Sequence, residues 1–195
     1  MRIRNTRVFA IIPALILLFS RSAWEVRHPI IPVVLFLAGL HLGAVGAIGR
    51  LWCSLYIAGH KDSNLIQQGP YSLCRNPLYF FSFLGAIGVG MATGTFTVPV
   101  LLAVSFLLYY PYVIKKEEVK LRAMFPNEFD GYCARVPRFF PESTALVEPD
   151  SCTMNPKVFR KHMFSVVWFI LIIGWLEVLA HLHATGILPV FFNLY

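Results

Sequence analysis

The chain has 195 residues, of which 57% are hydrophobic and only 14% are charged, and its mean hydropathy is +0.64. Soluble globular domains are about 45–50% apolar and about 25% charged, so this composition excludes a soluble domain and indicates an integral membrane protein. The basic residues that give the formal net charge of +7 are then expected at a membrane surface.

The apolar residues fall into five blocks, and about 20 helical residues cross the roughly 30 Å hydrocarbon core of a bilayer. We therefore expect an all-α protein with about five transmembrane helices, in Val8–Ser20, Ile30–Ile48, Leu78–Ala92, Phe96–Ile114 and Met163–Leu182. The first block is short, so its helix should be tilted or extended to Trp24. The alternative, a signal peptide, lacks a good cleavage site.

The third and fourth blocks are separated only by Thr93-Gly94-Thr95, which predicts a tight hairpin with the two helices side by side. The fourth helix should continue through Lys115–Arg122, a stretch without a helix breaker, and end at Pro126. The fifth is followed by a short apolar tail, which we place at the membrane interface. The chain thus divides into three segments, residues 1–60, 61–141 and 142–195.

All lysines and arginines except Arg21 and Arg27 fall on one side of this topology. The positive-inside rule then predicts a cytoplasmic N-terminus and an external C-terminus. Attraction to anionic lipid head groups accounts for the net charge, so we expect no nucleic-acid partner. The four cysteines have no metal-ligand spacing and are expected to be free thiols.

Two long polar segments, about Gly59–Asn76 and Lys115–Arg160, lie on the cytoplasmic side, where function is expected. At the end of the first, Asn76 is a good N-cap and Pro77 a good first helical residue, so the third helix should begin there. A helix N-terminus beside Arg75 is suited to an anion. The alternative is that Arg75 extends to the membrane surface.

Five short motifs now follow in order. They are Gly69-Pro70-Tyr71, Arg75-Asn76-Pro77-Leu78-Tyr79, Glu117-Glu118, Phe129-Asp130-Gly131-Tyr132 and Val136-Pro137-Arg138-Phe139-Phe140-Pro141. In order and separation this set resembles the isoprenylcysteine carboxyl methyltransferase and phospholipid methyltransferase family of integral membrane enzymes. Asn76 departs from that pattern, in which many members have histidine, and asparagine cannot carry a histidine's charge.

The resemblance implies S-adenosylmethionine as cofactor, held in a pocket made by the third and fourth helices with the cytoplasmic segments. The implied cofactor-binding residues are Tyr71, Arg75, Asn76, Pro77, Tyr79, Gly88, Gly90, Glu117 and Glu118. Arg75 would hold the cofactor carboxylate and one glutamate its ammonium or ribose, while the other glutamate pairs with a cation such as Lys115 or Arg122. The alternatives are helix packing for the glycines and ordinary interfacial positions for the tyrosines.

For the acceptor, the resemblance favours Arg138, with Arg135 and Tyr132 as further catalytic candidates, and implies a lipophilic small molecule or lipid that enters from the membrane. We expect no metal site, and Glu177 and His181, one turn apart, should pair with each other. The localisation implied is a bacterial inner membrane with a cytoplasmic active site. Two other readings remain: a sterol-reductase-like oxidoreductase that uses NADPH, and a non-catalytic scaffold of the same fold.

Overall fold

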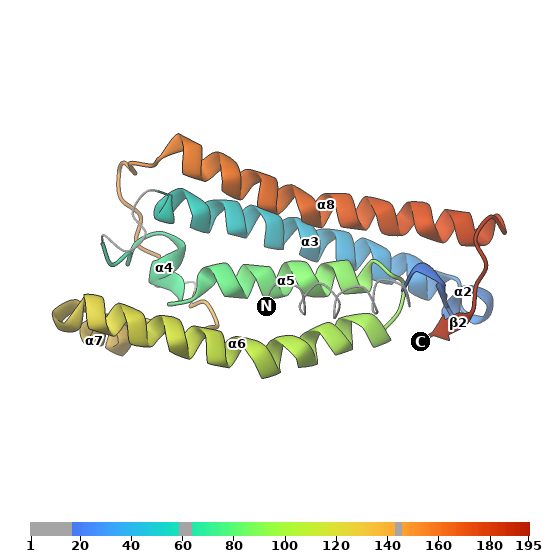
Figure 1. Cartoon of the computed structure of the whole chain (residues 1–195), viewed down its shortest axis with the longest axis horizontal. Coiled ribbons are helices and arrows are strands. Elements are labelled where there is room, and N and C mark those ends of the chain that lie inside the picture. The colour runs from blue at the N-terminus through green and yellow to red at the C-terminus, as the bar shows by residue number, and fades with distance from the viewer. Residues whose placement is uncertain (1–16, 59–63, 143–145) are drawn as a thin grey trace, which may run out of the picture.

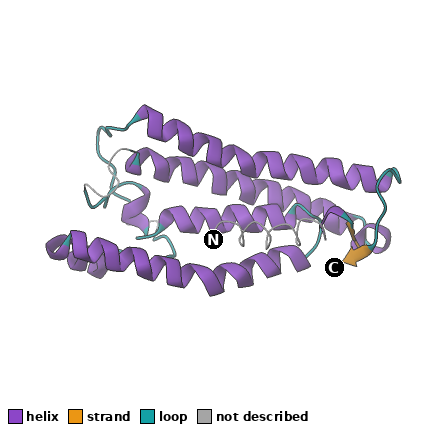
Figure 2. Ribbon diagram, in the orientation of Figure 1, coloured by secondary structure: helices purple, strands orange, loops and turns teal. Residues whose placement is uncertain are grey.

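The structure is a computed structural model that describes residues 17–58, 64–142 and 146–195. Four helices form an elongated bundle: α3 (Ile30–Ile57), α5 (Pro77–Met91), α6 (Thr97–Met124) and α8 (Pro156–Ala184). Short helices α4 (Pro70–Leu73) and α7 (Pro126–Arg135) lie at one end, and α2 (Trp24–Arg27) lies at the other with strands β1 (Ser20–Ser22) and β2 (Phe192–Leu194) (Figure 1). Figure 2 shows how little of the described chain is strand.

Three of these helices, α3, α6 and α8, are long and apolar enough to cross a membrane. The apolar helix α5 has 15 residues, which span about 22 Å. The class of helical integral membrane protein is thus confirmed, but the number of five spans is not. Most of the predicted first helix lies outside the described residues, and its extension to Trp24 is wrong, because Ser20–Ser22 is a strand.

Helices α3 and α5 approach so closely that their backbones touch. A side-chain carbon built on Gly46 would lie 2.5 Å from the backbone nitrogen of Gly85, and one built on Gly88 would lie 2.4 Å from that of Gly43. Small residues permit such approach in membranes, where packing replaces the hydrophobic effect as the force between helices. This contact fixes α5 in the middle of the bundle, with α3 on one side and α6 on the other (Figure 1).

The predicted hairpin and the predicted extension of the fourth helix are both confirmed. Gly94 turns the chain with a positive φ of 69°, and α6 then runs without interruption to Met124, just before Pro126. Figure 1 shows α6 bending near its middle, where Pro111 lies within the helix. The bend is explained by Pro111, which has no N–H to donate to the preceding turn.

At the end of the bundle that carries β2, the C-terminal tail folds back. Strand β2 pairs in parallel with β1, joining Ser20 to Phe192 and Ser22 to Leu194. The carbonyl oxygen of Tyr195 accepts hydrogen bonds from the backbone N–H groups of Phe96 and Thr97, at 2.9 and 2.6 Å. The tail therefore caps the first turn of α6, and this small sheet is absent from the all-α prediction.

The two polar segments, predicted to lie on the same side, contact each other at the opposite end of the bundle. The Gly69 N–H donates to the Val147 carbonyl at 2.8 Å, and the Glu142 N–H donates to the Leu73 carbonyl at 3.0 Å. Gly69 has a φ of 59°, and a side-chain carbon there would lie 2.3 Å from the ring of Tyr56. Only glycine fits this turn, which starts the first family-like motif.

Candidate functional site

The start of α5 is the centre of the candidate site. Asn76 precedes the helix and Pro77 is its first residue, as predicted. The Asn76 side chain makes no capping hydrogen bond to the helix. Its Nδ2 instead donates to the Arg138 carbonyl at 2.9 Å, and the Arg75 N–H donates to the Pro137 carbonyl at 2.8 Å. Two hydrogen bonds therefore attach the Val-Pro-Arg segment to the first turn of α5.

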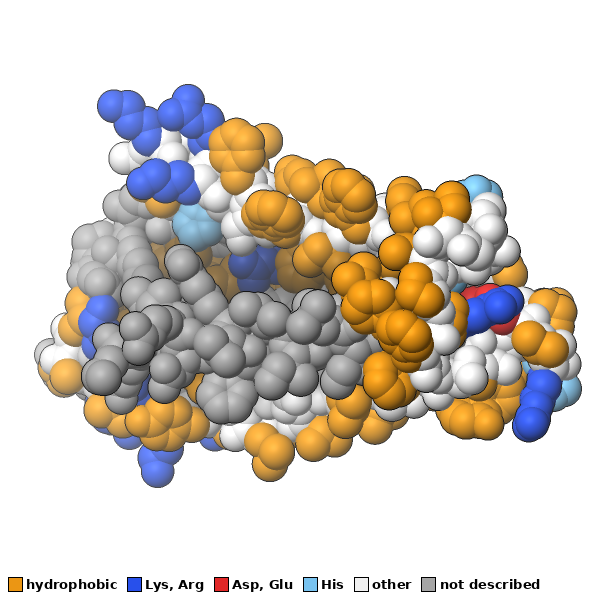
Figure 3. All heavy atoms as spheres, turned by 45° about the vertical axis from the view of Figure 1, so that its right-hand side comes forward, with side chains coloured by type: hydrophobic (Ala, Val, Ile, Leu, Met, Phe, Trp, Pro, Cys, Tyr) orange, Lys and Arg blue, Asp and Glu red, His pale blue; other side chains and the backbone are white. Residues whose placement is uncertain are grey.

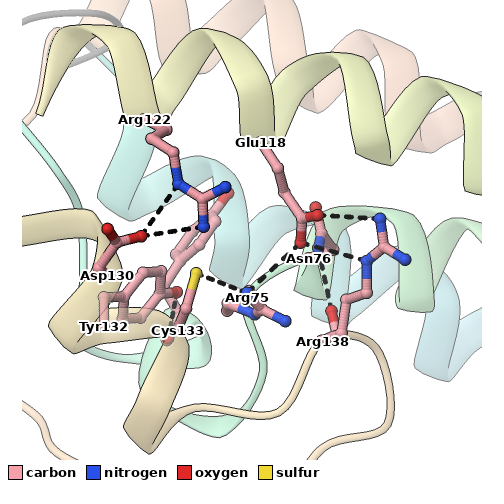
Figure 4. A network of polar contacts seen from close by, with 9 residues as sticks. Arg75, Asn76, Glu118, Arg122, Asp130, Tyr132, Cys133 and Arg138 are labelled. Carbon is pink, nitrogen blue, oxygen red and sulfur yellow. Dashed lines mark hydrogen bonds and ion pairs between the residues drawn. The ribbon is translucent and has the colours of Figure 1, made fainter. Parts of the chain in front are cut away.

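Glu118, on α6, joins the two arginines (Figure 4). Arg138 contacts it with two nitrogens, Nη2 to Oε2 at 2.9 Å and Nε to Oε1 at 3.2 Å. Arg75 Nη1 lies 3.6 Å from Oε1. The Glu118 and Arg75 side chains are 18% and 17% exposed, whereas that of Arg138 is 47% exposed. Glu118 thus accepts contacts from both arginines, and Arg138 is the one that is exposed to solvent.

The prediction that one glutamate pairs with a cation is confirmed, but the cation proposed for it is wrong. Arg122 pairs instead with Asp130, at 2.9 Å and in an exposed setting. Lys115 is exposed, and the cations that contact Glu118 come from the start of α5 and from the segment after α7.

Glu117 faces a different neighbourhood. Its Oε2 accepts the hydroxyl hydrogen of Tyr79 at 2.7 Å, and the Tyr79 ring lies 5.3 Å from that of Tyr110. Within the described residues no cation forms an ion pair with Glu117. The two adjacent glutamates therefore differ: Glu118 contacts two arginines, whereas the described partner of Glu117 is the hydroxyl of Tyr79.

Arg75 keeps hydrogen-bonding capacity. Its Nη1 also contacts Cys133 Sγ at 2.6 Å, while its Nε is buried and has no hydrogen-bond partner in the described structure. A buried, unpaired N–H of a cation is costly and favours a ligand that accepts from it. Sequence reasoning missed Cys133, because nothing local in Tyr132-Cys133-Ala134 shows which neighbour the thiol meets.

Tyr132 and Tyr71 are held in place by each other. The Tyr132 hydroxyl donates to the Tyr71 carbonyl at 2.7 Å, and Tyr132 is 2% exposed. Burial raises the pKa of both phenols above the ordinary value, and it raises the pKa of the buried Cys74 thiol to about 11. All three groups are therefore neutral near pH 7, and the Tyr132 hydroxyl already has a partner.

Arg135 lies beside a separate cavity of about 520 Å³, lined by residues 64–68, 149 and 151–153 together with Tyr56. Its Nη2 donates to Gln67 Oε1, at the edge of that cavity, at 3.1 Å, and the residue is exposed. The structure thus associates Arg135 with the loop before Gly69, whereas Arg138 belongs to the Glu118 network.

Gly88 and Gly90 are not brought to this network. Gly88 contacts the backbone of α3, and a side-chain carbon on Gly90 would lie 2.8 Å from the Cα of Pro99 on α6. Gly88 follows Pro77 by eleven residues, about 16 Å along the helix. Helix packing explains both positions, and their role with a cofactor stays a prediction.

All four cysteines are free. Among the described residues, no group of three or more histidine, cysteine, aspartate or glutamate side chains is arranged to hold a metal ion. The expected pair of Glu177 and His181 is wrong, because both side chains are exposed and the ion pairs of the described chain lie elsewhere.

The fold and the site together define a helical membrane protein with a charged, partly buried network at one end of its bundle. The model of the phospholipid methyltransferase family matches residues 32–128, which include both glutamates and the start of α5. The chain belongs to this family of integral membrane methyltransferases. This confirms the resemblance that the five sequence motifs indicated.

Three relatives are similar in sequence. The cobalt-zinc-cadmium resistance protein CzcN of Cupriavidus metallidurans is 38% identical over 88% of this chain and 78% of its own. The nickel-cobalt-cadmium resistance protein NccN of Alcaligenes xylosoxydans xylosoxydans is 36% identical over 87% of this chain and 78% of its own. The protein-S-isoprenylcysteine O-methyltransferase of Schizosaccharomyces pombe is 29% identical over 42% of this chain and 35% of its own. No solved structure matches the chain.

Proposed function

We propose that this protein transfers a methyl group from S-adenosylmethionine to a lipophilic acceptor with a carboxylate, a thiol or a lipid amine as the reacting group. The observation that carries the proposal is the pair of adjacent glutamates in different surroundings, beside an arginine whose Nε has no partner. This arrangement lies in the part of the chain that matches the methyltransferase family.

The residues present fit such a cofactor, which supplies a methyl group already activated by a positively charged sulfur. Glu117 Oε1 is available to accept from an ammonium or a ribose hydroxyl, since only Oε2 is used by Tyr79. Arg75 Nε is available to a carboxylate at the start of α5. The Tyr79 ring and the face of Tyr110 that is not stacked on Phe106 suit a sulfonium, because aromatic rings attract cations.

Positioning and exclusion of water are the chain's own contributions to such a transfer. Asn76 and Pro77 fix the first turn of α5, and the buried pair of Tyr71 and Tyr132 fixes the turn before it. Arg138, held by Glu118 on one side and half exposed on the other, is placed to orient an anionic group of the acceptor. Arg135 would act from the neighbouring cavity.

The acceptor reaches the site from the membrane in this proposal, because the outward faces of the long helices are apolar. Exposed Leu107, Leu108 and Tyr112 on α6 illustrate this surface. We place the N-terminus and the network on the cytoplasmic side of a bacterial inner membrane, where the positive-inside rule puts the basic end of the molecule. The division at residues 60 and 141 stays a prediction.

Calorimetry with purified protein tests the proposal. S-adenosylhomocysteine, the demethylated product, should bind, and NADPH should not. Tight NADPH binding without S-adenosylhomocysteine binding would instead support the sterol-reductase-like alternative, and binding of neither would support a scaffold. Membranes incubated with methyl-labelled S-adenosylmethionine should then yield a labelled lipophilic product, and release of that label by alkali would identify an ester.

A further inference from the structure

Arg50 lies within the helical bundle, away from the Glu118 network. It is on α3, seven residues before Ile57, or about 10 Å from that end of the helix. Its side chain is directed between helices: Nη1 donates to Ser82 Oγ on α5, and Nη2 lies 3.3 Å from Ser165 Oγ on α8. The guanidinium carbon is 5.8 Å from the centre of the Phe169 ring.

The charge of this guanidinium is not neutralised by the described chain. Its described hydrogen-bond partners are two hydroxyl groups, and none of the ion pairs in the described residues includes it. Its Nε is buried without a partner. Asp62 is the one acidic residue outside the described ranges. A partly buried cation with an unused donor is expensive in an apolar setting and calls for an anion.

The exposed surface beside this position is apolar. Ser165 is exposed, and its neighbours on α8 are apolar and also exposed: Phe164 is 68% and Trp168 is 62% exposed. Lys161 is exposed one turn before Ser165 on the same face of the helix. Figure 3 shows basic side chains gathered at the upper left of the molecule, next to apolar side chains that continue to the right. An anionic head group at the membrane surface would meet Lys161 first and Arg50 below it.

We propose that Arg50, Ser82 and Ser165 form a binding site for the oxyanion head, a carboxylate or phosphate, of a lipophilic molecule that enters between α3 and α8 from the bilayer. Guanidinium suits this role because its planar donors match the oxygens of a carboxylate or phosphate. The two serines would orient the guanidinium, and the tail would lie along the apolar face of α8. The site is distinct from the Glu118 network and requires no methyl transfer.

The test is binding of dioctanoyl phosphatidylglycerol or decanoate to the full chain in a nonionic detergent, measured by microscale thermophoresis. Dioctanoyl phosphatidylcholine controls for the tail, and sodium phosphate controls for a free anion. Both anionic lipophiles should bind at least about tenfold more tightly than either control. Arg50→Gln should lose at least about tenfold in affinity, Arg50→Lys should lose less, and Arg160→Gln, a matched loss of charge at an exposed position on α8, should bind as the wild type does.

Two results would overturn the site. Equal lipid affinity in Arg50→Gln and wild type would show that Arg50 contacts no head group. Phosphate binding as tight as lipid binding, and lost in Arg50→Gln, would make the ligand a free anion. Retained binding of S-adenosylhomocysteine by Arg50→Gln would show that the variant is folded, and Arg50→Lys gives a second comparison if it is not. Failure of the methyltransferase proposal would leave the lipid result unchanged.

Discussion

The two adjacent glutamates give the sharpest prediction, because the structure assigns them different partners. In Glu117→Gln the hydroxyl of Tyr79 keeps an acceptor, so stability should change by less than about 1 kcal/mol, while a charge-assisted contact to the cofactor worth about 1.5–3 kcal/mol is lost. The affinity for S-adenosylhomocysteine should then fall about tenfold to a hundredfold.

Glu118→Gln should behave in the opposite way. The pair with Arg138 is half exposed and contributes about 0.5–1 kcal/mol, but Arg75 is mostly buried and would lose its anionic neighbour 3.6 Å away. We expect a total loss of about 1–3 kcal/mol, or about 2–4 °C in unfolding temperature for each kcal/mol. Cofactor affinity should fall less than in Glu117→Gln.

Calorimetry and thermal unfolding of both variants, in the same detergent, provide the comparison. If Glu118→Gln abolishes cofactor binding and Glu117→Gln leaves it intact, the roles assigned here are reversed. If neither variant changes cofactor affinity, the network does not hold the cofactor.

Three further predictions concern single contacts. Asn76→His should retain a donor to the Arg138 carbonyl and stay as stable as the wild type. Asn76→Leu should lose about 1–3 kcal/mol of unfolding free energy, measured by chemical unfolding; equal stability of the two variants would show that this hydrogen bond does not stabilise the fold. Burial raises the pKa of the Cys74 thiol from 9.0 to about 11, so the neutral thiol contributes fully to stability below pH 9 and this contribution, about 2–3 kcal/mol, is lost as the pH rises toward 11. Cys74→Ala should flatten this decline in unfolding free energy. An unchanged pH profile in Cys74→Ala would contradict the assignment. Gly88→Ala should destabilise the bundle by about 1–3 kcal/mol, because the added carbon would overlap the backbone of α3. Gly174→Ala, with open space around it, should not destabilise the bundle. Similar unfolding temperatures for the two variants would refute the close packing at Gly88.

Local signals in the sequence predicted much of the site. Proline at the first helical position located the start of α5, and the absence of a breaker after Lys115 predicted the long α6. The roughly 100° between adjacent helical residues predicted that Glu117 and Glu118 would face different partners. These features depend on a few neighbouring residues, so a single sequence contains them.

Contacts between distant segments could not be predicted in the same way. The contact of Arg75 with Cys133 depends on how α7 packs against the start of α5, and the pairing of Ser20–Ser22 with Phe192–Leu194 joins the two ends of the described chain. The predicted second helix, Ile30–Ile48, ends before Arg50, whereas α3 continues to Ile57 and includes it. The inward direction of Arg50 follows from two serines on other helices, and neither serine stands out in the sequence.

The shortness of α5 has a consequence for the membrane itself. A helix of about 22 Å does not cross a hydrocarbon core of roughly 30 Å, so the polar residues at its start lie deeper than the head groups of an undisturbed leaflet. The leaflet must thin around them, or lipids must tilt toward them. The proposed methyl transfer should therefore respond to acyl-chain length. Bilayers of shorter lipids would bring the membrane surface level with the site, so that the proposed acceptor needs little displacement to reach it.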